Sequence, residues 1–112
     1  DNEWRYVSVR RFFIMVENSI TAGSQQFTFE ANDASTWVKV RGMIENYLVN
    51  LWKQGALQGS TPKEAFYVHV GLNQTMTADD ILAGRMIIQA GLAVIKPAEF
   101  VIINITQRMG VV

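Results

Sequence analysis

Two stretches in the first half of the chain carry apolar residues at three- and four-residue steps, the spacing of amphipathic helices. The first stretch runs from about Val7 to Ala22. We expect Gly23 to end it, because glycine adopts the left-handed conformation that closes a helix at little cost. The segment Gln25 to Glu30 alternates apolar and polar residues, which predicts a short strand or extended connector.

The second helical stretch is the clearest element of the sequence. Asn32 or Asp33 can cap its N-terminus, and Gly55 can end it. Its apolar stripe consists of Trp37, Val40, Ile44, Tyr47, Leu48 and Leu51. A helix face of five or six large side chains left in water would forfeit on the order of 10 kcal/mol of burial free energy. Both helices must therefore cover an apolar surface.

Short elements are predicted in the middle of the chain. The segment Thr61-Pro62-Lys63-Glu64 has a capping residue followed by proline, which is typical of a helix start and here predicts a single turn. The apolar run from Ala65 to Val70 predicts a strand. A second capping pattern at Thr77 opens another short helix, which we expect to end near Gly84.

The last third of the chain has the pattern of two strands. They are predicted over Met86–Val94 and Glu99–Gln107, and Pro97 marks the break because it cannot donate to a strand ladder. The fold class expected from these elements is α+β, with the two long helices packed on one face of a small, mainly antiparallel sheet.

Composition excludes several classes of function. Lys and Arg together number 10 and so do Asp and Glu, so the chain lacks the basic surplus of a nucleic-acid-binding protein. No segment approaches the ~20 apolar residues of a membrane helix, and Asp1-Asn2-Glu3 is not the basic start of a signal peptide. We therefore expect neither nucleic acid nor membrane as a partner.

Residues that could carry chemistry are few. The chain has no cysteine, which excludes disulfides, thiolate metal sites and a cysteine nucleophile. The single His69 lies in an apolar run and is interpreted as structural. Asp79 and Asp80 are explained by helix capping, and the serines stand in no G-x-S-x-G motif. We therefore predict no catalytic residue, no cofactor and no metal site, and conclude that the chain is not an enzyme.

Both ends of the chain have the character of strands that pair with another chain. The final strand is long, β-branched and almost uncharged, and Trp4, Tyr6 and Val7 form a short extended arm ahead of the first helix. Such segments can add to a neighbour's sheet by β-augmentation. They can equally complete the sheet of their own domain, and the pattern alone does not separate the two readings.

Four blocks of sequence resemble the C-terminal domain of contractile tail sheath proteins, the family of myophage, R-type pyocin and extracellular contractile injection system sheaths. The blocks are Val9-Arg10-Arg11-Phe12-Phe13, Phe29-Glu30-Ala31-Asn32-Asp33, Glu45-Asn46-Tyr47-Leu48 with Leu51 to Leu57, and Lys96 to Ile102. They occur in the family's order over about residues 9 to 107. Ala31 departs from the proline that the family often has at this position.

The resemblance implies a structural role. Such subunits would polymerise around an inner tail tube and form a homo-oligomer, a helical stack of rings. Contraction of this stack would drive the ejection of the tube. Its further partners would be baseplate and terminator proteins, and its place a phage virion tail or contractile injection particle assembled in the bacterial cytoplasm. The alternative is a self-contained phage baseplate or adaptor interaction domain.

The resemblance also divides the chain. Residues 1–112 would form one tail sheath C-terminal domain, with an N-terminal arm (1–8), a core (9–98) and a C-terminal strand and arm (99–112). Strands exchanged between subunits would complete the sheet. The residues expected to take part are Trp4, Arg5, Tyr6, Val7, Phe100, Val101, Ile102, Ile103, Asn104, Ile105, Thr106 and Gln107.

Charged residues on two predicted helices are candidates for the contact with the tube. They are Lys39 and Arg41 on the long helix, and Asp79, Asp80 and Arg85 in and after the short one. A sheath must hold the tube and then release it, which favours a modest polar surface. The alternative reading of each group is an ordinary solvated helix face.

Overall fold

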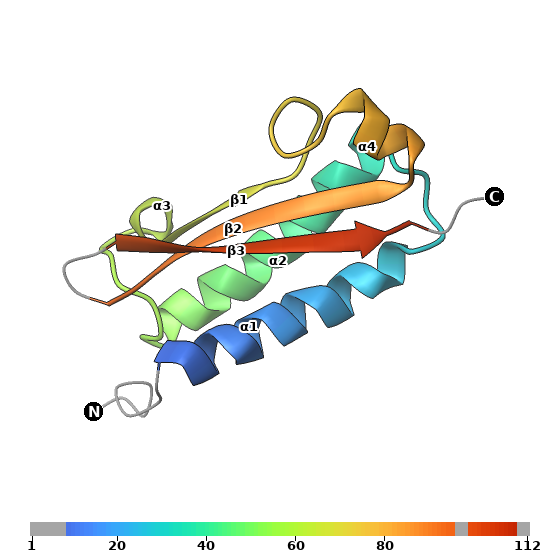
Figure 1. Cartoon of the computed structure of the whole chain (residues 1–112). Coiled ribbons are helices and arrows are strands. Elements are labelled where there is room, and N and C mark those ends of the chain that lie inside the picture. The colour runs from blue at the N-terminus through green and yellow to red at the C-terminus, as the bar shows by residue number, and fades with distance from the viewer. Residues whose placement is uncertain (1–8, 96–98, 110–112) are drawn as a thin grey trace.

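The computed structural model describes residues 9–95 and 99–109. Two long helices, α1 (Val9–Ser24) and α2 (Ala34–Lys53), pack on one face of a three-stranded antiparallel sheet (Figure 1). The strands follow the order β1 (Phe66–His69), β2 (Arg85–Ile95) and β3 (Glu99–Arg108). Short elements η2 (Gln25–Phe27), α3 (Pro62–Ala65) and α4 (Ala78–Leu82) connect them. The α+β prediction is confirmed, and Pro97 lies outside the described residues.

Helix α2 forms as its sequence predicts. The side chain of Asp33 accepts a hydrogen bond from the backbone N–H of Thr36 at 3.1 Å, and Gly55 has a φ of 86° just beyond the C-terminus. Its buried face consists of Thr36, Val40, Ile44, Leu48 and Leu51. Trp37 and Tyr47, at the margin of the predicted stripe, are half-buried against the core.

The prediction that Gly23 ends the first helix is wrong, since α1 continues to Ser24. The Ser24 hydroxyl is buried and donates to the Ile20 carbonyl oxygen at 2.8 Å. Gly23 instead allows a close approach between the helices, because a Cβ atom there would lie 3.0 Å from the Sδ atom of Met43 in α2.

The predicted strand over Gln25–Glu30 is also wrong. These residues form η2 and a turn, in which Thr28 N–H donates to the Gln25 carbonyl oxygen at 3.2 Å. The chain must reverse here to lay α2 beside α1, and a strand would carry it straight on. The alternation of apolar and polar residues does not bury one common face, since Phe27 packs against the core whereas Phe29 is 89% exposed.

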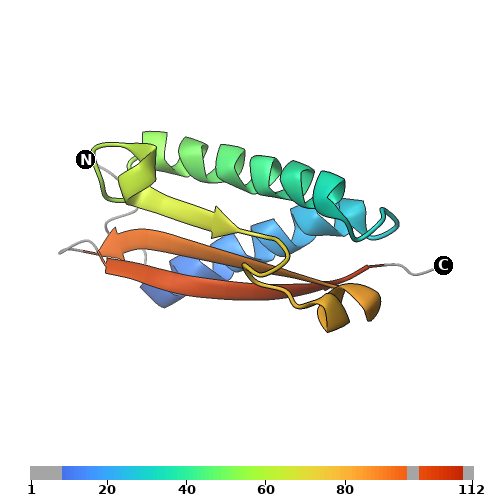
Figure 2. The same ribbon diagram turned by 90° about the horizontal axis from the view of Figure 1, so that it is seen from above.

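The core lies between the helices and the sheet. Strand β2 is central, and Met86, Ile88, Ala90 and Leu92 on its helix-facing side are all 0% exposed. Neighbours on β1 and β3 continue the same layer through register pairs such as Val68 with Ala90 and Ala90 with Ile103. Helix α1 packs beneath β3 and α2 beneath β1 (Figure 2).

No helix within residues 9–95 and 99–109 covers the outer face of the sheet, which has an aromatic cluster. The ring of Tyr67 lies over Gly91 on the neighbouring strand, so close that a Cβ atom at Gly91 would lie 2.1 Å from it. Phe100 meets the same ring edge-on with the centroids 5.3 Å apart, and the His69 ring lies 4.8 Å away. Gly91 is therefore required by the close approach of a ring.

We expect Gly91→Ala to lower the free energy of unfolding by about 1–3 kcal/mol, because the new methyl group must displace the Tyr67 ring. In a Tyr67→Ala background the same change should cost little. Chemical denaturation of the four proteins of this double-mutant cycle measures the effect, and equal costs in both backgrounds would contradict the explanation.

Gly42→Ala provides a control of opposite sign. Gly42 is exposed within α2, and a Cβ atom added there would meet no atom within 4 Å beyond the backbone of its own helix. Alanine should therefore raise the free energy of unfolding by about 0.5–1 kcal/mol through its higher helix propensity. A loss of stability here would show that α2 tolerates no side chain at this position.

Candidate functional site

Strand β3 forms an edge of the sheet. It pairs with β2 of its own chain from Arg108 opposite Arg85 to Glu99 opposite Ile95, and the described part of the chain places no strand on its other side. All eight predicted exchange residues from Phe100 to Gln107 lie in this strand. One side of β3 therefore completes its own sheet, and the other side is open.

Hydrogen bonds to three carbonyl oxygens in β2 and just before it show in which direction the backbone groups of this strand point. The Ala93 oxygen accepts from Gln58 N–H at 2.7 Å and the Ile87 oxygen from the Thr75 hydroxyl at 2.6 Å, both on the side of β1. The Gly84 oxygen, just before β2, accepts from Met109 N–H at 2.8 Å on the side of β3. Backbone groups alternate in direction along an antiparallel strand. The N–H and C=O groups of odd-numbered β2 residues therefore point toward β1, and those of even-numbered residues point toward β3.

This alternation fixes the groups that β3 presents to its open side. Residues of β3 that stand opposite odd-numbered residues of β2 direct their N–H and C=O groups away from β2. They include Phe100, Ile102, Asn104 and Thr106 and, at the end of the strand, Arg108. Main-chain donors and acceptors thus lie along the whole edge, in the arrangement that another strand requires.

The side chains of β3 do little to protect that edge. Ile103, Ile105 and Gln107 point into the core and are buried, whereas Phe100 and Ile102 on the outer face are 44% and 51% exposed. No residue from Phe100 to Gln107 is charged. Natural edges are usually blunted by charge or proline, and in β3 charged residues stand only at the two ends, Glu99 and Arg108. The middle of the edge has no such protection.

The second predicted exchange segment, Trp4 to Val7, lies outside the described residues. Its part in strand exchange stays a prediction.

The candidate tube-contact residues around α4 are held by local bonds. Thr77 and Asp80 form a reciprocal capping box, in which Thr77 N–H donates to Asp80 Oδ2 at 2.9 Å and Asp80 N–H donates to Thr77 Oγ1 at 3.2 Å. Arg85 Nη2 lies 2.8 Å from Asp80 Oδ1. The Thr77 backbone N–H, and after it the Arg85 guanidinium, lower the pKa of Asp80 below its usual value. Asp79 is exposed.

The candidates on α2 lie on its solvent side. Lys39 is exposed, and Arg41 Nε lies 3.1 Å from Glu45 Oε2 one turn later, as the spacing predicts. Asn32 ties the start of α2 to the start of β2 and to α4, because its Nδ2 donates to the Arg85 carbonyl oxygen at 3.0 Å and lies 3.5 Å from the Ile81 carbonyl oxygen. Figure 1 shows α4 beside the start of α2, the helix that has Lys39 and Arg41 in its first half.

Asn32 has a larger role than the cap that its position suggests. While its Nδ2 reaches the Arg85 carbonyl, its Oδ1 accepts from Trp37 Nε1 at 2.7 Å. Asp33 is the cap, so Asn32 is free to join α2 to the sheet. The bond to Arg85 spans 53 residues, and no local pattern in the sequence could indicate it.

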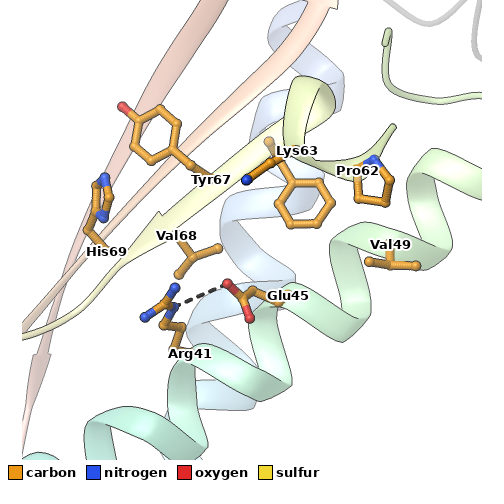
Figure 3. Close-up of a pocket in the computed structure, with 9 residues that line it drawn as sticks. Arg41, Glu45, Val49, Pro62, Lys63, Tyr67, Val68 and His69 are labelled. Carbon is orange, nitrogen blue, oxygen red and sulfur yellow. Dashed lines mark hydrogen bonds and ion pairs between the residues drawn. The ribbon is translucent and has the colours of Figure 1, made fainter. Parts of the chain in front are cut away.

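A groove between α2 and β1 was also not predicted. It encloses about 440 Å³ and is lined by Arg41, Glu45, Val49, Pro62, Lys63, Phe66, Tyr67, Val68 and His69 (Figure 3). Three separate elements supply these residues, so no local signal in the sequence could have located it.

Other kinds of site find no support in the part of the chain that the structure describes. Within residues 9–95 and 99–109, no three His, Asp or Glu side chains gather as metal ligands would. In the same ranges no helix has the length and apolar character needed to cross a membrane.

Comparison with known proteins connects this fold to one family. Residues 1–108 match the family model of the phage tail sheath C-terminal domain. A chain of the anti-feeding prophage baseplate is 49% identical with a TM-score of 0.76, over 97% of this chain and 30% of that one. A chain of the PVC sheath complex, an extracellular contractile injection system in the contracted state, is 46% identical with a TM-score of 0.74, over 88% and 28%.

A chain of the contracted anti-feeding prophage baseplate is 40% identical with a TM-score of 0.70, over 81% of this chain and 24% of that one. This chain therefore spans less than a third of the length of each of the three. A comparison with curated proteins finds no match.

The lowered pKa of Asp80 predicts an acid dependence of stability. An unfolded aspartate titrates near 3.8, so the contribution of Asp80 is complete above that pH and is lost as the pH falls through the lower folded value. The difference in unfolding free energy between wild type and Asp80→Ala should thus shrink on lowering the pH from about 6 to about 2. Denaturant titrations over this range measure it.

Asp79→Ala is the matched control, since Asp79 is the neighbouring exposed carboxylate of α4. It removes a carboxylate from the same helix but keeps the bonds of Asp80 to Thr77 and Arg85. A difference for Asp80→Ala that stays constant across the range would show that the carboxylate is not stabilised by its partners.

Proposed function

This chain belongs to the family of phage tail sheath C-terminal domains, and we propose that it is the part of a contractile sheath subunit that links neighbouring subunits around an inner tail tube. The solved structures that it resembles come from a sheath complex and from baseplates of contractile particles. In this proposal the chain is a structural element without catalytic function. Contraction and ejection of the tube belong to the longer subunit, since the chain spans less than a third of the similar chains.

The observation that carries the proposal is the open edge of β3. In a contracting cylinder the links between subunits must resist pulling while the subunits move. A ladder of main-chain bonds meets this requirement, because each bond has a net worth of only about 0.5–1.5 kcal/mol but all of them must break together. The outward groups of Phe100, Ile102, Asn104 and Thr106 can form such a ladder with a neighbouring chain.

Strand exchange between copies follows from this edge. β3 pairs through its open side with a strand of one neighbour, and the arm Trp4–Val7 is donated to the sheet of another. Each copy is then both donor and acceptor, which makes the assembly a homo-oligomer that extends as a helical stack of rings. Baseplate and terminator proteins would close its two ends in a phage tail or contractile injection particle.

The contact with the tube is assigned to the end of the molecule where α2 begins and α4 lies. Lys39 and Asp79 are exposed there and available to a partner. Arg41 is paired with Glu45 but half-exposed, whereas Asp80 and Arg85 are bonded to one another and hold α4 in shape. A contact made by a few exposed charges is weak enough to be released on firing.

The second candidate is a self-contained baseplate or adaptor domain. It is favoured by the complete ladder between β3 and β2 within one chain, and by the baseplate origin of two of the similar chains. Such a domain would be a monodisperse monomer or small ring in solution, whereas a sheath domain with both arms polymerises.

The proline variant Asn104→Pro separates these two functions. The N–H of Asn104 faces the open edge, so proline removes no bond of the β2–β3 ladder, and proline is tolerated at such edge positions. We expect Asn104→Pro to remain folded by circular dichroism but to lose polymerisation in sedimentation velocity and electron microscopy.

Asn104→Ala is the control for that variant, because it removes the same side-chain contact with Gln89, a 3.3 Å hydrogen bond, but keeps the backbone donor. It should assemble as wild type does. A wild-type chain that stays monomeric, or a proline variant that assembles equally well, would favour the self-contained domain.

Charge reversal tests the tube contact. Lys39→Glu should weaken co-sedimentation with assembled tube protein by up to about fivefold at low salt, since an exposed ion pair is worth about 0.2–1 kcal/mol. The difference should vanish at high salt. Lys53→Glu at the far end of α2 is the control and should bind like wild type. Equal binding of both variants would exclude Lys39 from the contact.

A further inference from the structure

Phe29 and Leu82 are large apolar side chains that the fold leaves in water. Phe29 is 89% exposed and Leu82 is 84% exposed, the highest values among the large apolar residues that the structure describes. Single apolar residues on a surface are ordinary, so exposure alone assigns no role to either of them. Their backbone supports and their common position do.

Phe29 stands in a turn that is fixed by hydrogen bonds on both sides. Glu30 N–H donates to the Phe27 carbonyl oxygen at 3.0 Å across the turn. Gln107 Nε2 donates to Thr28 Oγ1 at 3.3 Å and ties the turn to the end of β3. The ring of Phe29 is thus presented to a partner on an ordered backbone, which lowers the entropy lost on binding.

Leu82 is the last residue of α4, which is held equally well. Ala83 N–H donates to the Asp79 carbonyl oxygen at 2.9 Å, and Gly84 N–H donates to the Ile81 carbonyl oxygen at 3.1 Å. A capping box fixes the start of the same helix. Leu82 therefore also projects from a backbone that binding need not order.

Asn32 joins these two supports. It follows Phe29 by three residues, and its Nδ2 donates to the Arg85 carbonyl oxygen at 3.0 Å. The same atom lies 3.5 Å from the carbonyl oxygen of Ile81, the neighbour of Leu82. Figure 1 shows the turn before α2 and helix α4 at the same end of the molecule. Phe29 and Leu82 are called the apolar pair below.

The area of the apolar pair fits a contact that is made and later broken. The two side chains together expose on the order of 300 Å². A stable dimer needs about 800 Å² from each partner, so the pair is too small to hold two copies together by itself. One or two buried side chains can nevertheless supply most of the binding energy of an interface.

On the basis of the proposed function, which places the tube contact beside α4, we propose that Phe29 and Leu82 are its apolar anchors and insert into an apolar depression on the inner tail tube. Lys39 and Asp79 then form a charged rim of both signs around a contact whose strength is largely independent of salt. Because bonds within the chain hold both anchors in place, the fold loses nothing when the tube is released.

Co-sedimentation with assembled tube protein at low and high salt tests the assignment. The variants are Phe29→Ala, Leu82→Ala and the double variant. Val38→Ala is the matched control, because Val38 is 70% exposed on α2. None of these side chains is buried, so all variants should remain folded by circular dichroism. Sedimentation velocity without tubes measures the assembly of copies in the same samples.

We expect Phe29→Ala to weaken tube binding by about tenfold or more and Leu82→Ala to weaken it several-fold, at both salt concentrations. Val38→Ala should bind like wild type, and every variant should assemble as wild type does.

Three results would overturn the anchors alone: a double variant that binds tubes as wild type does, losses that disappear at high salt, or a loss of assembly between copies with tube binding unchanged. A wild-type chain that does not sediment with tubes would overturn the tube contact of the proposed function itself.

Discussion

The pairing of β2 with a strand on either side is the constraint on which the rest of the structure depends. Its helix-facing residues are 0% exposed and form the centre of the core, so α1 and α2 must lie on that face. A sheet of three strands ordered β1-β2-β3 necessarily has two outer edges, and helices that cover a face cannot satisfy the backbone groups of an edge. The arrangement that completes the core thus leaves β1 and β3 available to other chains.

In the proposed function, the edges of the sheet link neighbouring subunits. A link that must bear load while subunits move is best made from many weak bonds in register, and β3 offers uncharged residues from Phe100 to Gln107 with outward main-chain groups. The charged residues that are candidates for the tube contact fall into two groups, those with a partner within the chain and those that stay exposed. Asp80 and Arg85 are occupied in holding α4 next to the start of α2, whereas Lys39 and Asp79 stay exposed.

The two outer edges of the sheet differ in length and in surroundings. β3 is ten residues long, while β1 has four residues and is flanked by α2 and α3.

The sequence by itself determined the elements whose causes are local. Periodicity located both long helices and the hairpin strands, and a capping pattern located the start of α4 at Thr77, because each depends on residues a few positions apart. The cap of α2 stayed open between Asn32 and Asp33 until the structure assigned it to Asp33. It failed where a contact distant in sequence prevails: Gly23 serves the packing against Met43, and Gln25–Glu30 turns because α2 must return beside α1. The Tyr67 ring over Gly91, the Asn32 link and the groove beside β1 were decided only by the tertiary structure, since each joins segments that no local pattern relates.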